Sequence, residues 1–308
     1  MKKRIAVAVV LTVLSTAALL APAALFAGGP SDPITIGVCF VSLTYPYFVP
    51  MKVDAEKMAA NLGAKLIFAD AQGSSARQMS EVQNFVAEKV SGILIDPVTV
   101  DSLVPAIEKA VAAGIPVATV DREANTDKAV VHVGPDEVEG GRTAAHYIIE
   151  RLGNKGTVIE LEGIPGASPT ISRKQGFDEV ISKSNVKILA SKDAEFDRAM
   201  ATRIMSGLMK DYPRFNAVFA HNDDMIIGAI QAISEAGNDL STKVTVGYDA
   251  SSDGLTYVKQ GKLSATVATF QGQQASQALS ILVDYIKSGK KPEKALIYVT
   301  PKLVTSAQ

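Results

Sequence analysis

Five charged or amide side chains form a set suited to binding a neutral polyhydroxyl ligand: Asp121, Arg122, Arg173, Asn222 and Asp249. Each hydroxyl of such a ligand both donates and accepts hydrogen bonds, so burying it requires fixed partners. Carboxylates accept from neighbouring hydroxyls, guanidinium groups donate in a fork, and amides do both. These residue types therefore predict a polar binding site rather than a reaction centre.

Four aromatic residues add the apolar surface that such a ligand needs: Tyr45, Tyr47, Phe48 and Phe196. The C–H faces of a sugar ring are apolar and favour aromatic planes. Each residue also fits an ordinary role on its own, because Asp and Arg are common in solvated loops and aromatic residues can start a helix against the core. The prediction therefore depends on whether the fold brings them together.

Signatures of catalysis, metal binding and cofactor binding are scarce. The motifs G-x-G-x-x-G, G-x-x-x-x-G-K-[ST], H-E-x-x-H and G-x-S-x-G do not occur, and Ser168 lacks the second glycine of a nucleophile elbow. His132, His146 and His221 are far apart in sequence and are best interpreted as structural. The single cysteine, Cys39, excludes an intrachain disulfide and a thiolate metal cluster. We therefore predict a protein that is not an enzyme and that uses no metal and no cofactor.

Short β-rich runs alternate with longer segments in which apolar residues recur every three or four positions. The predicted strands are Ile34–Val41, Lys65–Ala69, Gly92–Asp96, Pro116–Asp121, Val130–Gly134, Thr157–Glu162, Val186–Ala190, Ala217–His221, Val244–Asp249 and Ala265–Phe270. This alternation is typical of α/β proteins, in which helices cover both faces of parallel sheets. Ligands bind outside the carboxyl ends of such strands, where Asp121, Asn222 and Asp249 stand.

These strands are too many for one comfortable open sheet, and the sequence Val-Gly-Pro-Asp at 133–136 offers a joint. We therefore predict two lobes. The N-terminal lobe comprises residues 34–135 plus 269–295, and the C-terminal lobe comprises residues 136–268 plus 296–308. The late helix Gln273–Ser288 and the extended run Ala295–Val304 are too few elements for a third domain, so we expect them to pack on the lobes.

The first residues have the order of a secretory signal: the cationic stretch Met1–Arg4, the apolar run Ile5–Leu20 and then small residues. Cleavage after Ala23 fits the A-x-A rule, whereas cleavage after Ala27 reaches a flexible glycine pair. We predict a signal peptide over residues 1–27 and a periplasmic protein that is soluble after cleavage. The alternative is an uncleaved anchor helix over Ile5–Phe26, which is just long enough to span a bilayer.

The composition indicates an ordinary globular protein. The chain has 308 residues, of which 47% are hydrophobic and 20% charged, and at roughly 100–200 residues per domain this length predicts about two domains. Its 31 basic residues against 32 acidic ones give a net charge of -1, and the predicted signal peptide removes Lys2, Lys3 and Arg4. A protein that grips phosphates along a nucleic acid needs a basic excess, so we expect no nucleic acid partner.

Seven motifs, read in order, resemble the ribose-binding proteins of bacterial ABC sugar importers. They are Ser42–Phe48, Ala118–Arg122, Leu161–Gly166, Arg173–Phe177, Phe196–Arg198, Val218–Asp223 and Val246–Asp249. The resemblance runs from about Thr35 to the last predicted strand. It implies the type I periplasmic binding protein fold, with two Rossmann-like lobes whose parallel sheets are joined by a three-strand hinge.

The resemblance also implies roles for individual residues. The ring-stacking aromatics of the family match Tyr47, Phe48 and Phe196, and its polar ligands match Asp121, Arg122, Arg173, Asn222 and Asp249. Two positions depart from the pattern: Tyr45 stands where ribose binders have asparagine, and Thr269 stands where they have glutamine. We therefore expect a monosaccharide ligand, either a ribose-like pentose, a hexose or a related polyol, with ribose not the tightest.

The function implied is that of an ABC transporter's solute-binding protein, which delivers its sugar to the transmembrane permease subunits. One alternative is a receptor that presents the ligand to a chemoreceptor or a sensor kinase. A second is a secreted carbohydrate-active enzyme using Asp223 and Asp224, but adjacent carboxylates point in different directions and do not flank one bond. A sugar-responsive repressor would need a DNA-binding head in place of the export signal.

Overall fold

The computed structural model describes residues 33–306. The predicted signal peptide lies outside this range and stays a prediction. Within the described range, no helix is long and apolar enough to cross a membrane.

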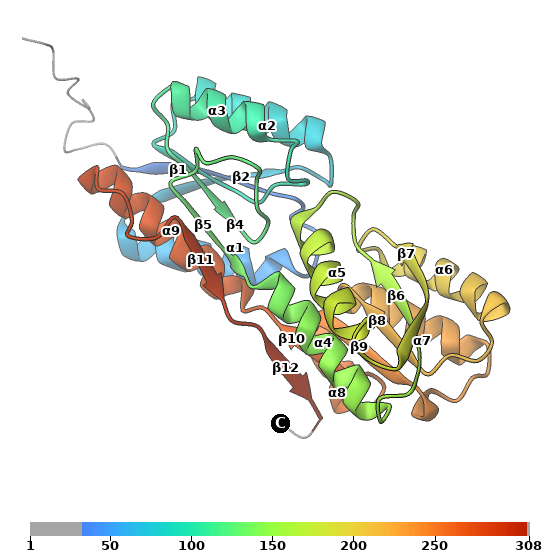
Figure 1. Cartoon of the computed structure of the whole chain (residues 1–308). Coiled ribbons are helices and arrows are strands. Elements are labelled where there is room, and N and C mark those ends of the chain that lie inside the picture. Colours follow the sequence, from blue (N-terminus) through green and yellow to red (C-terminus); the bar gives the residue numbers. More distant parts are fainter. Residues whose placement is uncertain (1–32, 307–308) are drawn as a thin grey trace, which may run out of the picture. The chain divides into compact units, whose positions relative to one another are not determined.

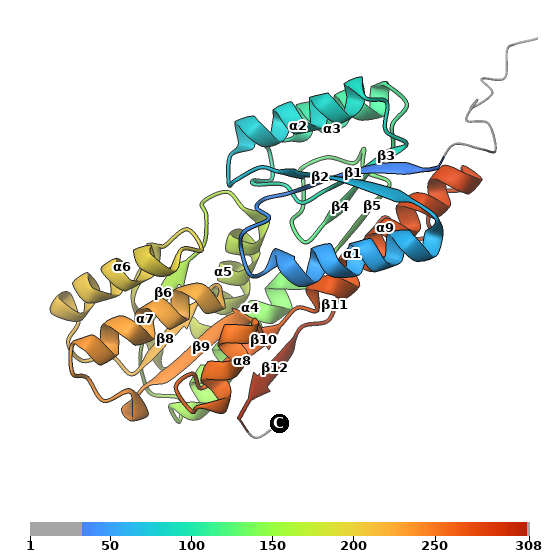
Figure 2. The same ribbon diagram turned by 180° about the vertical axis from the view of Figure 1, so that it is seen from behind.

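The first sheet is parallel throughout, in the order β11-β5-β4-β3-β1-β2. Its strands are β1 (Thr35–Phe40), β2 (Lys65–Asp70), β3 (Gly92–Ile95), β4 (Val117–Val120), β5 (Val131–Pro135) and β11 (Leu296–Val299). Helices α1 (Phe48–Leu62) and α9 (Gln271–Ser288) cover one face, and α2 (Ser75–Ala87) and α3 (Val104–Ala112) cover the other (Figure 1, Figure 2). Because both faces are covered, every residue of β3 and β4 is buried and the strands read as continuous apolar runs.

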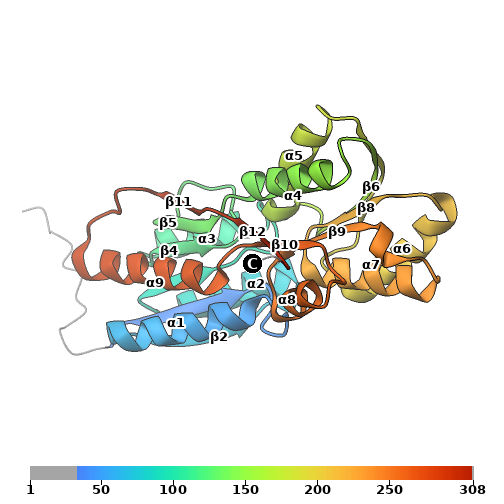
Figure 3. The same cartoon turned by 90° about the horizontal axis from the view of Figure 1, so that it is seen from below.

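The second sheet has the order β12-β10-β9-β8-β6-β7, with β12 antiparallel to β10 and the other pairs parallel. Its strands are β6 (Gly156–Glu162), β7 (Val186–Asp193), β8 (Ala217–Ala220), β9 (Val244–Asp249), β10 (Ala265–Ala268) and β12 (Lys302–Thr305). Helices α4 (Glu137–Arg151) and α5 (Ser168–Ile181) cover one face. Helices α6 (Arg198–Asp211), α7 (Asp223–Glu235) and α8 (Ser252–Lys259) cover the other (Figure 3), and a short 3-10 helix spans Leu240–Thr242.

The chain passes between the two sheets at three places: from β5 into α4, from β10 into α9, and from β11 into β12. We call each sheet with its covering helices a lobe. The predicted α/β architecture with two Rossmann-like lobes is confirmed, and each predicted strand is present with ends shifted by a few residues at most.

The end of the chain differs from the prediction. The run Ala295–Val304 contains two strands, of which β11 pairs with β5 in the first sheet and β12 pairs with β10 in the second. Placing residues 296–299 in the C-terminal lobe was therefore wrong. The two strands are separated at Pro301, which has no N–H for a sheet ladder. A run of uniform β-propensity does not indicate which sheet each half joins.

Candidate functional site

Strands from both sheets end at one cleft. Asp121 and Arg122 follow β4, Asn222 lies just beyond β8, and Asp249 is the last residue of β9. This is the edge at which open parallel sheets bind ligands, because the backbone turns away there and leaves side chains free to converge. Side chains of both lobes line this cleft.

Nine of the ten residues expected to contact the ligand line this cleft: Tyr45, Tyr47, Phe48, Asp121, Arg122, Arg173, Phe196, Asn222 and Asp249. They come from six separate parts of the chain. Thr269 is not among the described residues that line it. Its side chain is fully buried, and its Oγ1 has no hydrogen-bond partner within residues 33–306.

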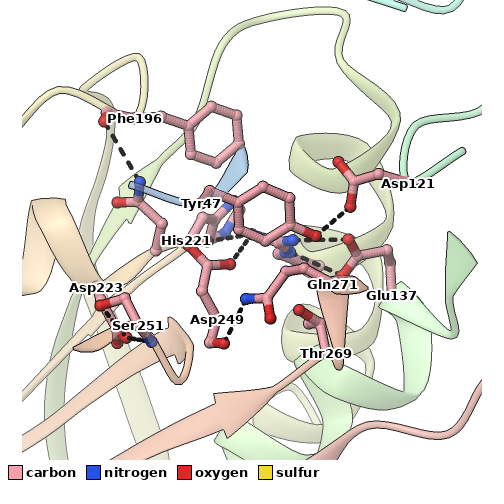
Figure 4. Close-up of polar contacts among 12 residues, drawn as sticks. Tyr47, Asp121, Glu137, Phe196, His221, Asp223, Asp249, Ser251, Thr269 and Gln271 are labelled. Atoms are coloured by element: carbon pink, nitrogen blue, oxygen red, sulfur yellow. Dashed lines mark hydrogen bonds and ion pairs between the residues drawn. The ribbon is translucent and has the colours of Figure 1, made fainter. Parts of the chain in front are cut away.

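The aromatic side of the cleft comes from the start of α1. Tyr45 is half-exposed and stacks on Phe48 at 6.5 Å between ring centroids, while Phe48 is buried and packs edge-to-face with Tyr47 at 5.1 Å. The hydroxyl of Tyr47 donates a hydrogen bond to Oδ1 of Asp121 (Figure 4). This segment therefore offers ring faces at the rim and a polar group at the buried end.

Arg122 forms two hydrogen bonds within its own lobe, and its Nε has no hydrogen-bond partner among the described residues. Its backbone N–H donates to Oδ1 of Asp96 at 3.3 Å, and its Nη1 donates to the carbonyl of Val98 at 2.9 Å. Its Nε has no hydrogen-bond partner in the described part of the chain. The guanidinium lies 5.3 Å from the ring centroid of Phe196, which belongs to the other lobe. The same Nε is buried and lies 3.9 Å from Oδ1 of Asp96 and 4.0 Å from Oδ2 of Asp121, so the side chain is fixed in position between carboxylates.

Arg173 is oriented by a buried carboxylate that the sequence did not single out. Its Nε and Nη2 donate to the two carboxylate oxygens of Glu137 at 2.8 and 2.6 Å, and its Nη1 donates to the carbonyl of His221. Burial lowers the pKa of Arg173, but Glu137 outweighs that effect and holds it well above its usual value. Glu137 therefore occupies the two-donor face of the guanidinium, and the remaining Nη1 lies 3.7 Å from Oδ1 of Asp249.

Burial disfavours the charged forms of the two cleft carboxylates, Asp249 and Asp121. Burial raises the pKa of Asp249 well above its usual range, although Arg173 opposes this. Burial and the nearby Glu137 also raise the pKa of Asp121, against the effects of Arg122 and Tyr47. Hydrogen-bond donors from a ligand would favour the charged forms of both groups. The site is therefore short of donors in the way that a polyhydroxyl ligand can supply.

Asn222 forms hydrogen bonds both to the first turn of α7 and to the backbone of Phe196. Its Oδ1 accepts from the N–H of Met225 at 2.8 Å, which caps the helix, and its Nδ2 donates to the carbonyl of Phe196 at 3.3 Å. Phe196 has φ of 61°, so its ring is placed by an uncommon left-handed backbone. The Asn222 amide therefore fixes both the start of α7 and the backbone that carries the Phe196 ring.

The segment after β10 places an amide beside Asp249. Gln271, at the start of α9, donates from Nε2 to the carbonyl of Asp249 at 2.7 Å (Figure 4). The backbone carbonyl of Thr269 instead accepts a hydrogen bond from Nε2 of Gln274 at 2.6 Å. The amide two residues beyond Thr269 thus reaches the turn that carries Asp249 from the first residue of a helix.

Asp223 and Asp224 do not act as a pair. Asp223 accepts from Thr266 and Ser251, whereas Asp224 pairs with Arg198 at 2.9 Å between Oδ1 and Nε. Their side chains diverge as expected for adjacent residues at the start of a helix. Residues 33–306 also contain no group of three or more His, Cys, Asp or Glu side chains arranged to hold a metal ion.

The two lobes touch directly beside the cleft. The N–H of Glu123 donates to Oγ of Ser168 at 2.9 Å, and the N–H of Val100 donates to the carbonyl of Gly166 at 3.0 Å. Ser168 therefore helps to join the two lobes. These bonds close the cleft on the side of α5.

The sequence-based site did not include two residues that contact its arginines, namely Glu137 and Asp96. Glu137 follows the joint at 133–136 and is 7% exposed, and Asp96 directly follows β3 and is fully buried. Asp96 stood at a predicted strand end, which was a usable signal. Glu137 reads as an ordinary acid in the first turn of a helix, so nothing local distinguishes it.

Comparison with known proteins gives one consistent picture. A family model described as a periplasmic binding protein domain matches residues 36–291. The ribose import binding protein RbsB of Bacillus subtilis is 38% identical over 268 residues, which cover 87% of this chain and 86% of that protein.

Solved structures extend the similarity to other sugars and polyols. An ABC transporter solute-binding protein of Bacillus halodurans with bound myo-inositol superposes with a TM-score of 0.85 and 29% identity, covering 91% of this chain and 96% of that one. A fructose-binding periplasmic domain of a hybrid two-component system gives a TM-score of 0.84 and 30% identity, covering 89% and 91%.

Proposed function

This chain belongs to the periplasmic binding protein family, and from that premise we propose that it captures a monosaccharide in its cleft and delivers it to an ABC permease. The observation that carries the proposal is the convergence of Asp121, Arg122, Arg173, Asn222 and Asp249 with four aromatic side chains at one cleft. Such a set matches the hydroxyls and the C–H faces of a small sugar.

Closure of the lobes would report that the site is occupied. A ligand that contacts residues of both lobes favours the closed state by its differential affinity for the two states. Asp121 and Arg122 belong to the first lobe, whereas Arg173 and Asp249 belong to the second. A sugar bound to all four therefore stabilises the bonds that already join the lobes, such as that from Glu123 to Ser168.

A second destination for the closed form is supported by one neighbour. The fructose-binding domain described above is part of a two-component system, so the same fold serves signalling there. A sensor kinase or chemoreceptor partner reads the same lobe closure as a permease does. Loss of sugar uptake on deletion of the gene supports transport, and loss of sugar-dependent signalling with uptake intact supports the alternative.

The lobe boundaries and the export step are also proposals. We place residues 34–135 and 269–299 in the N-terminal lobe and residues 136–268 and 300–308 in the C-terminal lobe, which moves β11 to the sheet that it joins. Residues 1–27 are proposed to be cleaved on export to the periplasm. Intact mass of periplasmic material starting near Gly28 supports this, and a membrane-bound product that retains Met1 contradicts it.

The experiment that tests the binding function separates capture from catalysis. Purified protein is saturated with each member of a panel of pentoses, hexoses and polyols, and the bound fraction is recovered after denaturation and analysed by mass and NMR. We expect one or more sugars to be retained and returned unchanged. A converted product would support the enzyme alternative, and retention of none would refute the proposal.

A further inference from the structure

The turn after β9 presents Asp249 to the cleft through an uncommon backbone. Asp249 has φ of 103° and Ala250 has φ of 51°. Residues other than glycine rarely adopt such angles, and they persist where the surrounding structure holds them. The position of the Asp249 carboxylate therefore depends on what fixes this turn.

The group that fixes it is the carboxylate of Asp223, the first residue of α7. Ser251 donates to its Oδ2 twice, from the backbone N–H at 2.7 Å and from Oγ at 2.9 Å (Figure 4). Thr266 of β10 donates to its Oδ1 at 2.7 Å, and the same hydroxyl accepts from the N–H of Ala250 at 3.1 Å. The carboxylate therefore joins α7 and β10 to both residues that follow Asp249.

The pocket around Asp223 suits an acceptor that carries a full charge. Every direct partner donates to it, and an ionised carboxylate is the side chain that accepts at both oxygens. Asp223 is 1% exposed. A Cβ at Gly254 would lie 2.0 Å from Oδ2, and one at Gly247 would lie 2.4 Å from Oδ1. The close backbone approach leaves no room to turn the group toward other partners.

We propose that Asp223 is a positioning residue for ligand binding, whose buried carboxylate holds the turn that presents Asp249 to the sugar. This inference rests on the proposed sugar-binding function, because Asp249 is taken there as a ligand contact. Asp223 also lines the cleft, but both of its carboxylate oxygens are occupied by Ser251 and Thr266, so it acts through the turn. It is one of the two acids that sequence reasoning considered only as an alternative catalytic pair.

The charges near Asp223 make its role dependent on pH. Asp224 of α7 and Asp253 of α8 both pair with Arg198 of α6, and Asp249 of β9 faces Arg173. In the described part of the chain, no cation forms an ion pair with Asp223 itself. Burial raises the pKa of Asp223 to about 7, against the hydrogen bonds from Thr266 and Ser251. Protonation near neutral pH turns one acceptor into a donor and opposes the bonds that hold the turn.

The test compares wild type with Asp223→Asn, which keeps the shape but replaces one acceptor by a donor. Kd is measured by titration calorimetry at pH 5.5, 7.0 and 8.5, with the tightest sugar that the panel yields for wild type. We expect the variant to bind at least tenfold more weakly at pH 8.5. We expect this ratio to shrink at pH 5.5, where wild-type Asp223 is itself protonated. The charge of Asp223 also raises the pKa of Asp249, so the ratio reports the loss of the Asp223 charge together with its effect on Asp249.

Two further variants separate positioning from a general loss of structure. Asp211→Asn makes the same chemical change at an exposed position at the end of α6 and should leave Kd unchanged. Thr266→Val removes the hydroxyl that links Ala250 to Asp223 and should weaken binding. Because both changes break one network, the double variant with Asp223→Asn should bind less weakly than the product of the two single effects predicts.

The results separate the inference from the function on which it rests. Wild-type affinity retained by Asp223→Asn at every pH would overturn the positioning role while leaving the sugar-binding function intact. A pH-independent loss of affinity that comes with a lower melting temperature of the ligand-free protein would also overturn it, since it indicates a structural role. Absence of binding by wild type would overturn the function itself and, with it, this inference.

Discussion

The hydroxyl of Tyr47 donates a hydrogen bond to the carboxylate of Asp121, and both side chains line the cleft. Burial, assisted by the charge of Asp121, raises the pKa of Tyr47 well above its usual value, so the phenol remains a donor. The bond occupies one oxygen of a carboxylate that is proposed to accept from the sugar. A sugar hydroxyl must therefore share Asp121 with Tyr47 or displace it.

Replacing Tyr47 by Phe tests this relationship. The change keeps the ring but leaves Asp121 with one donor fewer, and a hydrogen bond to a charged group contributes about 1.5–3 kcal/mol. We expect the free energy of unfolding of the ligand-free protein to fall by about that amount. Urea unfolding followed by circular dichroism measures it. Tyr212→Phe, a partly buried tyrosine at the end of α6, serves as the control. Equal stability of Tyr47→Phe and wild type would show that the bond is not made in solution.

Replacing Glu137 by Gln tests the orientation of Arg173. The bidentate pair is buried, so removing one charge leaves an uncompensated guanidinium and costs several kcal/mol. We expect sugar affinity to fall at least tenfold, because Arg173 loses the partner that aims it at the cleft. Titration calorimetry measures the affinity. Glu139→Gln, two residues away on α4 and partly exposed, should bind like wild type. Equal affinities of the two variants would contradict the role of Glu137.

Acid sensitivity is expected from Glu160, which is fully buried in β6. Burial raises its pKa, but hydrogen bonds from His221, Lys174 and Ser191 outweigh this and lower it to about 2. A carboxyl whose folded pKa is depressed from 4.5 contributes stability above pH 4.5 and loses it as the pH falls toward 2. The contribution is about 3 kcal/mol. Urea unfolding of wild type and Glu160→Gln between pH 6 and pH 2 should show a steeper acid decline for wild type. Parallel declines would contradict this prediction.

We expect sugar preference to depend on Tyr45, at the rim of the cleft, more than on Thr269. Tyr45 is half-exposed and lines the cleft, whereas Thr269 is buried outside it and the Gln271 amide reaches the Asp249 turn instead. We still predict that ribose is not the tightest ligand and that another pentose, a hexose or a polyol binds at least tenfold better, which is about 1.4 kcal/mol.

The measurement is a calorimetric sugar panel on wild type, Tyr45→Asn, Thr269→Gln and the double variant. The structure assigns the larger shift in ranking to Tyr45→Asn, since its side chain is the one that lines the cleft. Ribose as the tightest ligand of wild type would refute the prediction, and so would a ranking that none of the three variants changes.

Sequence reasoning predicted the strands correctly because they depend on local patterns, and it placed the candidate site, which stays a prediction, at their carboxyl ends. Parallel strands covered on both faces are short apolar runs, and polar residues directly after them, such as Asp121 and Asn222, must lie at the carboxyl edge. What it missed depends on tertiary pairing. Glu137 meets Arg173 only because α4 packs beside α5, which carries Arg173. The division of the last run between two sheets is likewise decided by partners far away in sequence, β5 and β10.

The central claim is that the strand-end residues bind a sugar between the lobes, and ligand-dependent melting of wild type, Arg122→Ala and Asp249→Ala tests it most directly. At about one hundred times Kd, a sugar stabilises the native state by about 2.7 kcal/mol. For a protein of this size, that amounts to an upward shift in Tm of roughly 5–10 °C. We expect this shift for wild type and none for either variant at the same sugar concentration. Variants that still shift like wild type would show that the sugar binds elsewhere and would contradict the account.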